Sequence, residues 1–403
     1  MQLGRDFFRL SSAAAISNFG DGVMGAAFPL LVATITRDPI LVAGATVALR
    51  LPWLMFALIS GALVDRMDRR RVMVTTDLVR GVLVGAMALT VIYDVATVPI
   101  AYVIAFGLGL TETFFDTSSE AIVPALVSED MLPAANGRLQ AVEWVGNAFV
   151  GPPVGAALFA LAPFVPFGLD ALTFFAAALL IWLIPGRFEP ERLALTSLRI
   201  DVGTGLKWLL AHRVLRTLSI MAGITNAFVM GIVAVFVLFA QEELGVGELG
   251  YGILLSSTGL GGLAGAVVAP RLVDRFGSGS TIQGTVVAGV AVAIVIGLTS
   301  SPWVAGPFMA IYGASITAWN VVAVTLRQSL TPDELRGRVA GAARLLAWGA
   351  QPVGAALGGL VAAAVGLRAP FFVAAAVWGV MWATTVRIVN NQSVEEALGR
   401  RVT

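Results

Sequence analysis

The chain has 403 residues, of which 58% are hydrophobic and only 13% are charged. Soluble domains carry about 25% charged residues, so this composition excludes an ordinary soluble protein and predicts a membrane protein. The formal net charge is +1 and cysteine is absent, which leaves no basis in bulk charge for a nucleic-acid partner and excludes disulfides and cysteine-ligated metals.

Long apolar stretches recur along the chain, each bounded by charged residues or by proline and glycine. Because a helix needs about 20 apolar residues to cross a bilayer, these stretches predict an all-α membrane protein with twelve transmembrane helices. The expected spans are 10–35, 38–64, 72–94, 97–118, 138–162, 164–185, 217–240, 250–272, 280–300, 302–326, 338–365 and 369–389.

Positive charge is concentrated in alternate connections between these spans. The connections after the even-numbered spans hold most of the arginines, whereas the opposite face has only Arg37 and Arg368. By the positive-inside rule, the arginine-rich connections and both termini are predicted to face the cytoplasm.

Two short motifs repeat across the middle of the chain. The sequence of 63–66 recurs at 272–275, and that of 153–158 recurs at 352–357. Both copies fall at equivalent points, which predicts two parallel repeats of six helices. The expected parts are an N-terminal bundle at 1–186, a cytoplasmic linker with an amphipathic segment at 187–216, and a C-terminal bundle with a short cytoplasmic tail at 217–403.

Several of these motifs resemble the major facilitator superfamily, and the resemblance covers essentially the whole chain. The segment 61–71 looks like the family's cytoplasmic motif between helices 2 and 3, with Asp68 where many members have glycine. Residues 151–155 are similar to the helix 5 motif of proton-coupled drug exporters. Segments 115–127, 135–136, 170–174 and 336–339 look like the bacterial branch that contains macrolide, tetracycline-type and enterobactin exporters.

The resemblance implies the major facilitator fold, a place in the bacterial inner membrane, and proton-coupled export of small lipophilic or amphiphilic compounds, as in multidrug or antibiotic efflux. A siderophore exporter, a lipid or lysolipid translocator and a passive channel remain open alternatives. An ATP-driven pump is disfavoured because the chain has no glycine-rich phosphate loop and no soluble domain. We expect a monomeric transporter rather than an enzyme, with no cofactor and no nucleic-acid partner, acting on a small molecule and protons in the lipid bilayer.

The cytoplasmic motif places an acid beside four arginines at a helix end. The resemblance implies a gating latch in which Asp65 pairs in one conformation and releases in the other; the alternative is a cluster that only fixes orientation. The gating set is Gly61, Asp65, Arg66, Arg69, Arg70, Asp274 and Arg275. The helix 5 motif, Gly151, Pro152 and Gly155, is expected either to allow close helix packing or to shape a bend.

Charged residues inside the predicted spans are the strongest indication of a functional site, because each costs at least about 2.5 kcal/mol at the bilayer centre unless it is paired or hydrated. Asp21 and Arg50 lie at similar depths on antiparallel spans, which allows an ion pair. Glu112 and Asp116 share one face of the fourth span, with Asp116 near its cytoplasmic edge. Glu143 falls at nearly the depth of Glu112. These five residues are the expected proton-coupling or substrate set; the alternative is a structural role.

In the resembled fold, helices 1, 4, 7 and 10 line the central cavity, which implies that Asn226 and Asn320 line it together with Asp21 and Glu112. The second half has no deep carboxylate on these spans, so proton handling is expected in the first half. Span 4 lacks the arginine that many drug–proton antiporters carry there, unless Arg50 or Arg80 takes its place.

Three further charged residues, Asp77, Arg80 and Asp170, are expected nearer the ends of spans 3 and 6 in structural roles. Aromatic residues such as Phe115 and Trp319 are expected either to wall a lipophilic ligand or to serve ordinary packing.

Overall fold

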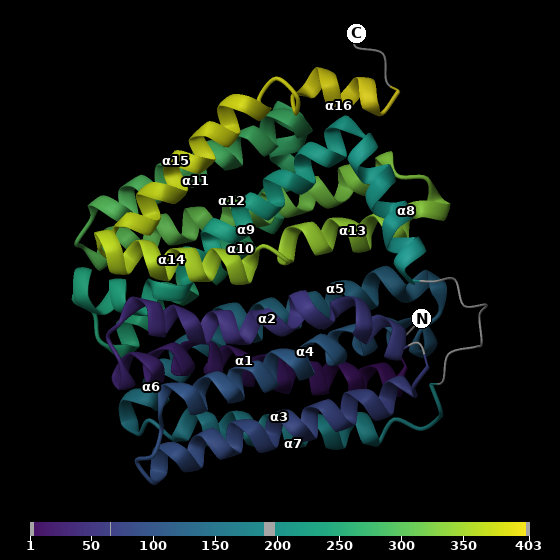
Figure 1. The fold of residues 1–403 in the computed structure, drawn as a ribbon. Coiled ribbons are helices and arrows are strands. Elements are labelled where there is room, and N and C mark those ends of the chain that lie inside the picture. The colour runs from purple at the N-terminus through teal and green to yellow at the C-terminus, as the bar shows by residue number, and fades with distance from the viewer. Residues whose placement is uncertain (1–3, 65, 189–197, 400–403) are drawn as a thin grey trace. The chain divides into compact units, whose positions relative to one another are not determined.

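The structure is a computed structural model that describes residues 4–64, 66–188 and 198–399. The described chain is almost entirely helical (Figure 1). Eleven helical segments are long and apolar enough to cross a membrane, and Ala369–Thr385 is a shorter apolar helix. The predicted all-α membrane protein with twelve spans is therefore confirmed.

The chain divides into two compact units, which we call unit 1 and unit 2. Unit 1 comprises Met1–Ala194 and Val246–Ser256. Its helices are α1 (Arg5–Ile35), α2 (Pro39–Val64), α3 (Arg69–Ile92), α4 (Val98–Leu126), α5 (Leu132–Glu143), α6 (Gly151–Leu161) and α7 (Val165–Trp182), with a short 3₁₀ turn at Glu129–Met131 and a π-helix at Trp144–Val150.

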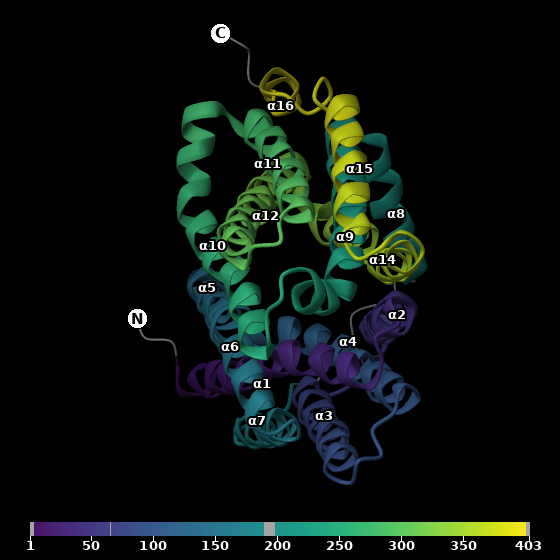
Figure 2. The same ribbon diagram turned by 90° about the vertical axis from the view of Figure 1, so that its left-hand side faces the viewer.

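Unit 2 comprises Leu195–Gly245 and Ser257–Thr403. Its helices are α8 (Leu198–Ala211), α9 (Arg213–Leu238), α11 (Ser278–Leu298), α12 (Pro302–Leu330), α13 (Arg336–Trp348), α14 (Gln351–Val365), α15 (Ala369–Thr385) and α16 (Asn391–Ala397), together with the part of α10 (Glu248–Phe276) that begins at Ser257. A π-helix, Phe239–Glu243, extends α9, and a 3₁₀ turn, Asp333–Leu335, precedes α13. Within unit 2, α11 packs against both α12 and α15 (Figure 2).

Close backbone contacts occur at equivalent places in the two units. A Cβ atom added at Gly155 of α6 would collide with the backbone of α1, and one at Gly354 of α14 would collide with the backbone of α9. The same holds for Gly109 of α4 against α2 and for Gly313 of α12 against α10. Small residues therefore let the helices of each repeat approach closely, as membrane helices do where lipid supplies no hydrophobic drive.

Two spans that were expected to be continuous α-helices are broken. In the span expected at 138–162, α5 gives way to the π-helix before α6 begins. In the span expected at 338–365, α13 ends at Trp348 and α14 begins at Gln351. Each break directly precedes a proline, Pro152 or Pro352, which has no N–H for the i to i−4 hydrogen bond of a helix.

Candidate functional site

Unit 1 contains a group of charged side chains on four helices. They are Asp21 on α1, Asp77 and Arg80 on α3, Asp116 on α4 and Asp170 on α7, and we call these five residues the charged cluster. Asp77 and Asp170 are fully buried, Arg80 is buried, and Asp21 and Asp116 are partly buried. Four carboxyl groups therefore share one guanidinium within the membrane-spanning part of unit 1.

Arg80 is held at the centre of this cluster by both charge and aromatic contacts. Its Nη1 atom lies 3.8 Å from Asp77 Oδ1. Its guanidinium carbon lies 4.9 Å from the centroid of the Phe115 ring and 5.4 Å from that of Phe174. It also interacts electrostatically with Asp21. Because a guanidinium is attracted to the face of an aromatic ring, the two phenylalanines fix Arg80 without neutralising any carboxyl group.

Asp170 brings α7 into contact with α1. Its Oδ1 accepts a hydrogen bond of 3.1 Å from Thr173 Oγ1. A Cβ atom added at Gly20 of α1 would collide with both of these oxygen atoms. Among the described residues, Asp170 Oδ2 and both carboxyl oxygens of Asp77 have no hydrogen-bond partner. Buried carboxyl oxygens without a partner are costly when the group is ionised.

The sequence expectation placed Asp77, Arg80 and Asp170 apart from the coupling residues, whereas the structure gathers them around Asp21. Arg80 and Asp170 both act on Asp21 electrostatically. One signal in the sequence pointed to this cluster: Asp77 and Arg80 are three residues apart in an apolar run and so share a helix face. Nothing in the sequence indicated that α7 turns Asp170 toward α1.

An ion pair between Asp21 and Arg50 was a possibility, and Arg50 does act on Asp21 through its charge, but its contact within salt-bridge distance is with Glu112. Arg50 Nη1 lies 3.5 Å from Glu112 Oε1, and each of these side chains is about one third exposed. Helical rise predicted their depths, but the pairing depends on how α2 and α4 are rotated, and α2 packs closely along α4. Glu112 in turn is the charge that acts most strongly on Glu143 at the end of α5.

Asp116 was expected near the cytoplasmic edge of its span, which was predicted to end at residue 118. The structure continues α4 to Leu126, ten residues beyond Asp116 or about 15 Å along the helix. Asp116 therefore lies inside the helix, where it interacts with Glu112 and Arg80. Just beyond Asp116, Thr117 Oγ1 donates to the carbonyl oxygen of Thr113 and Ser118 Oγ to that of Phe114, so these hydroxyl groups bond within the helix.

The expected gating set is only partly visible, because Asp65 lies outside the described residues. Arg66, Asp274 and Arg275 are exposed, and a Cβ atom at Gly61 would meet open space. The gating latch therefore remains a prediction.

Two arginines of the gating set are anchored within unit 1. Arg69 Nη1 donates a hydrogen bond of 3.0 Å to the carbonyl oxygen of Ala121, and Arg70 Nη1 donates to that of Ile184. Asp68, which departs from the family's glycine, is buried and caps α3 by accepting a bond of 3.2 Å from the Arg71 amide. The departure thus has a local structural purpose, since an aspartate is among the best N-cap residues.

The helix 5 motif is buried against α1. Gly151, Pro152 and Gly155 are all buried. A Cβ atom at Gly151 would lie 2.5 Å from the Cα of Gly22, one residue beyond Asp21. The motif therefore packs closely against α1, and a π-helix, Trp144–Val150, directly precedes it; the expected bend remains a prediction.

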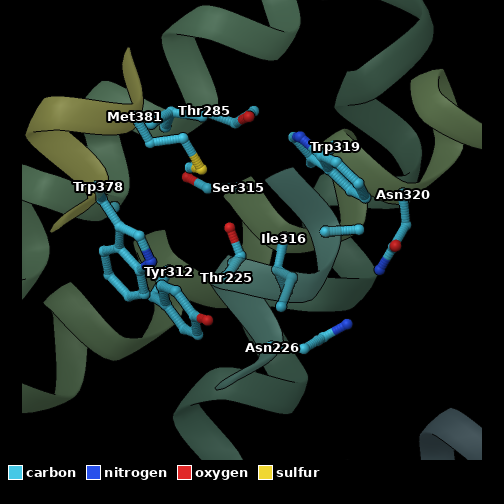
Figure 3. A pocket seen from close by; sticks show the side chains of 13 residues that line it. Thr225, Asn226, Thr285, Tyr312, Ser315, Ile316, Trp319, Asn320, Trp378 and Met381 are labelled. Carbon is cyan, nitrogen blue, oxygen red and sulfur yellow. The ribbon is translucent and has the colours of Figure 1, made fainter. Parts of the chain in front are cut away.

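Unit 2 contains a pocket with about 540 Å³ of empty space, part of it open to solvent, between α9, α11, α12 and α15. Asn226 and Asn320, both expected to line a cavity, line this pocket, as does Trp319. None of its lining residues is acidic, basic or histidine, so we call it the neutral pocket. Figure 3 shows Tyr312 and Trp378 together on one side of it, across from Trp319 and Asn320.

Sequence reasoning missed the pair formed by Tyr312 and Trp378. Their rings are stacked, with centroids 6.3 Å apart and an interplanar angle of 11°. Their positions on α12 and α15 are far apart in the chain, and no sequence pattern signalled that they meet. Among the described residues, no group of acidic, histidine or cysteine side chains in either unit could hold a metal ion.

Comparison with known proteins agrees with this architecture. Residues 3–398 match the model of the transmembrane secretion effector family. The multidrug efflux pump Tap of Mycolicibacterium fortuitum is 31% identical over 89% of this chain and 90% of its own. The pump of the same name from Mycobacterium tuberculosis is 28% identical over 90% of this chain and 88% of its own.

The fold is also found among solved structures. That of the nucleoside transporter NupG aligns with a TM-score of 0.76 over 96% of this chain and 99% of that one, at 12% identity, a likeness that shows the fold alone. The family match and the relative at 31% identity both cover most of the chain. The chain therefore belongs to the transmembrane secretion effector family of the major facilitator superfamily, whose members are multi-pass membrane transporters.

Proposed function

We propose that this transporter exports small lipophilic or amphiphilic compounds by alternating access, driven by protons that flow inward through unit 1. The relatives named multidrug efflux pumps support the substrate class. In this proposal the alternating halves are 1–186 and 217–403, joined by the linker 187–216, which falls partly outside the described residues.

The observation that carries the proposal is the charged cluster. If all four carboxyl groups were ionised, the cluster would hold three uncompensated negative charges in a medium of low dielectric constant, which is prohibitively costly. Some of these groups must therefore bind protons, and they can release them when water reaches the cluster from the other side. Such a cluster stores and passes protons without any cofactor.

Within the first half we assign distinct roles to the charged residues. Asp21 is the leading proton carrier because it lies beside Arg80 and in the helix that packs on the bent span 5. Glu112, paired with Arg50 and partly exposed, is the leading site for a proton or for the charge of a cationic substrate. Asp116 and Glu143 are the next candidates, since both interact with Glu112.

Further parts of the proposal concern placement and gating. We place the protein in a bacterial inner membrane as a monomer, acting as a transporter and not as an enzyme, with both termini in the cytoplasm. A reporter that is active only outside the cytoplasm, fused after Thr403, should stay inactive; strong activity would refute this topology.

The gating latch is tested separately. Asp65→Asn should leave the protein inserted and folded but slow export severely, and wild-type rates in that variant would refute the latch.

The coupling is tested by transport of ethidium in proteoliposomes with an imposed pH gradient and an internal pH dye. Wild-type protein should move ethidium against its concentration gradient while protons move the opposite way. Asp21→Asn and Glu112→Gln should each change the pH dependence or abolish the gradient-driven phase. Glu129→Gln, an exposed residue of the connection after α4, is the matched control and should behave as wild type.

Two outcomes would count against the proposal. Ethidium flux that only dissipates its own gradient, with no proton movement, would indicate a passive channel. If both variants keep gradient-driven transport with an unchanged pH profile, these two carboxylates are structural and the coupling site lies elsewhere.

A further inference from the structure

The neutral pocket of unit 2 has polar atoms that its own helices leave unused. Trp378 is only 3% exposed, and its Nε1 has no hydrogen-bond partner among the described residues. The hydroxyl oxygen of Tyr312, on the adjacent ring, is likewise buried and without a partner in the described chain. Buried N–H and O–H groups are almost always bonded, so two unpaired ones beside the same cavity indicate that a ligand completes them.

The rest of the lining supplies hydrogen-bond acceptors and no charge. Thr285 Oγ1 and Ser315 Oγ donate to carbonyl oxygens of their own helices, at 2.7 and 2.8 Å, which leaves their lone pairs free to accept. Asn226 uses its amide nitrogen to bond the carbonyl oxygen of Ala347 at 3.0 Å. A charged ligand buried here would lose its hydration without meeting a counter-charge, so the lining selects against ions.

The walls of the pocket favour a flat ligand. The rings of Tyr312 and Trp378 are nearly parallel, and the indole of Trp319 lies on the opposite side (Figure 3). Aromatic side chains bind planar rings by stacking or edge contacts, and an indole N–H adds a fixed donor direction.

We propose that the neutral pocket is a binding site for an uncharged, planar ring system that carries a hydrogen-bond acceptor such as a ring carbonyl. The acceptor receives hydrogen bonds from Trp378 Nε1 and the Tyr312 hydroxyl, while the ring lies between the aromatic walls. This inference rests on the proposed export function, because it makes the pocket the place where unit 2 holds the uncharged part of an exported compound.

The test measures equilibrium binding to the purified full-length protein in nanodiscs, without any proton gradient. The probes are acridone, a neutral tricyclic ring with a carbonyl group, and N-methylacridinium, a permanent cation with the same ring skeleton. The variants are Tyr312→Phe and Trp378→Phe, which remove one polar atom each. The controls are Trp303→Phe, at an exposed position of the same helix as Tyr312, and Tyr93→Phe, also exposed.

We expect acridone to bind the wild type and both controls, and to bind each pocket variant about 3- to 10-fold more weakly, the loss of one neutral hydrogen bond. N-methylacridinium should bind equally to all five proteins.

The inference is overturned if acridone fails to bind the wild type, or if both pocket variants bind it as tightly as the controls. Should Trp378→Phe fail to fold, Tyr312→Phe carries the test by itself. Failure of the export proposal looks different: transport of ethidium would then be absent or independent of the pH gradient, while binding of acridone would still respond to the two pocket substitutions.

Discussion

In unit 1, charged residues lie within α1, α2, α3, α4 and α7, whereas in unit 2 the stretches 217–241, 257–270, 276–326, 345–367 and 369–386 contain no charged residue at all. The two units nevertheless share the same helical repeat and the same close contacts between spans 1 and 5 and between spans 7 and 11. One repeat has thus kept its backbone packing while its two copies diverged in chemistry. This difference in charge is the basis of our proposal that unit 1 exchanges protons and unit 2 holds the ligand.

The same separation appears at the short connections that begin α3 and α11. Asp68 and Gly277 are equivalent positions in the repeated motif, and each is the N-cap of its helix. Asp68 caps α3 with its carboxylate and also accepts a bond of 3.4 Å from the Phe188 amide. Gly277 has no side chain and a φ of +81°, and Asn391 bonds the connection instead.

The largest effect should come from removing the central charge of unit 1. Arg80→Met leaves buried carboxyl groups without their counter-charge and should lower the free energy of unfolding by about 3–5 kcal/mol. Arg50→Met breaks the pair with Glu112, in which each side chain is about one third exposed, and should lower the free energy of unfolding by about 1 kcal/mol or less. Thermal unfolding of the two purified variants compares them. Equal losses would show that Arg80 is not a buried counter-charge and would remove the distinction between the two arginines.

In unit 2, charge should matter at the end of the bundle and not within it. Arg368 donates to Glu243 Oε2 at 2.7 Å, to the carbonyl oxygens of Gly297 and Thr299 at 2.9 and 3.0 Å, and to Ser300 Oγ at 2.8 Å. Arg368→Gln loses most of these bonds and should lower the free energy of unfolding by about 2 kcal/mol.

The control for that prediction is Arg271→Gln, because the exposed Arg271 side chain bonds, among the residues that the structure describes, within its own helix to the carbonyl oxygen of Val267. This control should stay within about 0.5 kcal/mol of wild type. If both substitutions lower the unfolding temperature equally, Arg368 does not join the ends of these helices as the contacts indicate.

A smaller effect should distinguish the two connections. Asn391→Ala removes bonds to the Phe276 carbonyl oxygen and to the Ser280 amide and should cost about 1–2 kcal/mol. Asp68→Gly should cost less, about a few tenths of a kcal/mol, because glycine is an acceptable N-cap. Chemical unfolding of both variants measures this. A greater loss for Asp68→Gly would show that the connection before α3 depends on the carboxylate more than its counterpart depends on Asn391.

The smallest effect concerns the start of α9, which His212 caps, whereas Gly4 at the start of α1 makes no side-chain cap. Partial burial lowers the pKa of His212 below its ordinary 6.5. The neutral ring therefore adds stability above pH 6.5 that is lost as the pH falls through the lowered value. His212→Asn keeps a capping side chain and should flatten the unfolding temperature between pH 7 and pH 5 by a small amount. An unchanged pH profile would contradict this.

Much of the fold could be predicted from the sequence because span length, charge asymmetry and repeated motifs are all one-dimensional signals. The twelve spans, the repeat and the lack of a deep carboxylate on the lining spans of the second half were of this kind. Residue depth along a helix is also readable, which is why Asp21 and Arg50 were placed at similar levels. The rotation of each helix is not, so the partner of Arg50 and the gathering of Asp77, Arg80 and Asp170 around Asp21 had to come from the structure.

Irregular backbone was the second feature that could not be predicted from the sequence. The helix 5 motif was expected either to pack closely or to shape a bend, and the sequence indicated neither the π-helix before Gly151 nor the break after Trp348. Only part of the neutral pocket could be predicted. Asn226 and Asn320 were conspicuous as amides in apolar spans. Tyr312 and Trp378 cannot be told from ordinary packed aromatic residues in the sequence, because only the structure shows that their polar atoms are unpaired.

The central claim, that unit 1 exchanges protons while unit 2 holds the ligand, is tested most directly by counting protons released when acridone binds. Calorimetric titrations in buffers of different ionisation enthalpy give this number for wild type, Asp21→Asn and Trp378→Phe. The account predicts proton release in wild type, less release per bound acridone in Asp21→Asn, and weaker binding with the wild-type proton number in Trp378→Phe. An unchanged proton number in Asp21→Asn, or a changed one in Trp378→Phe, would contradict it.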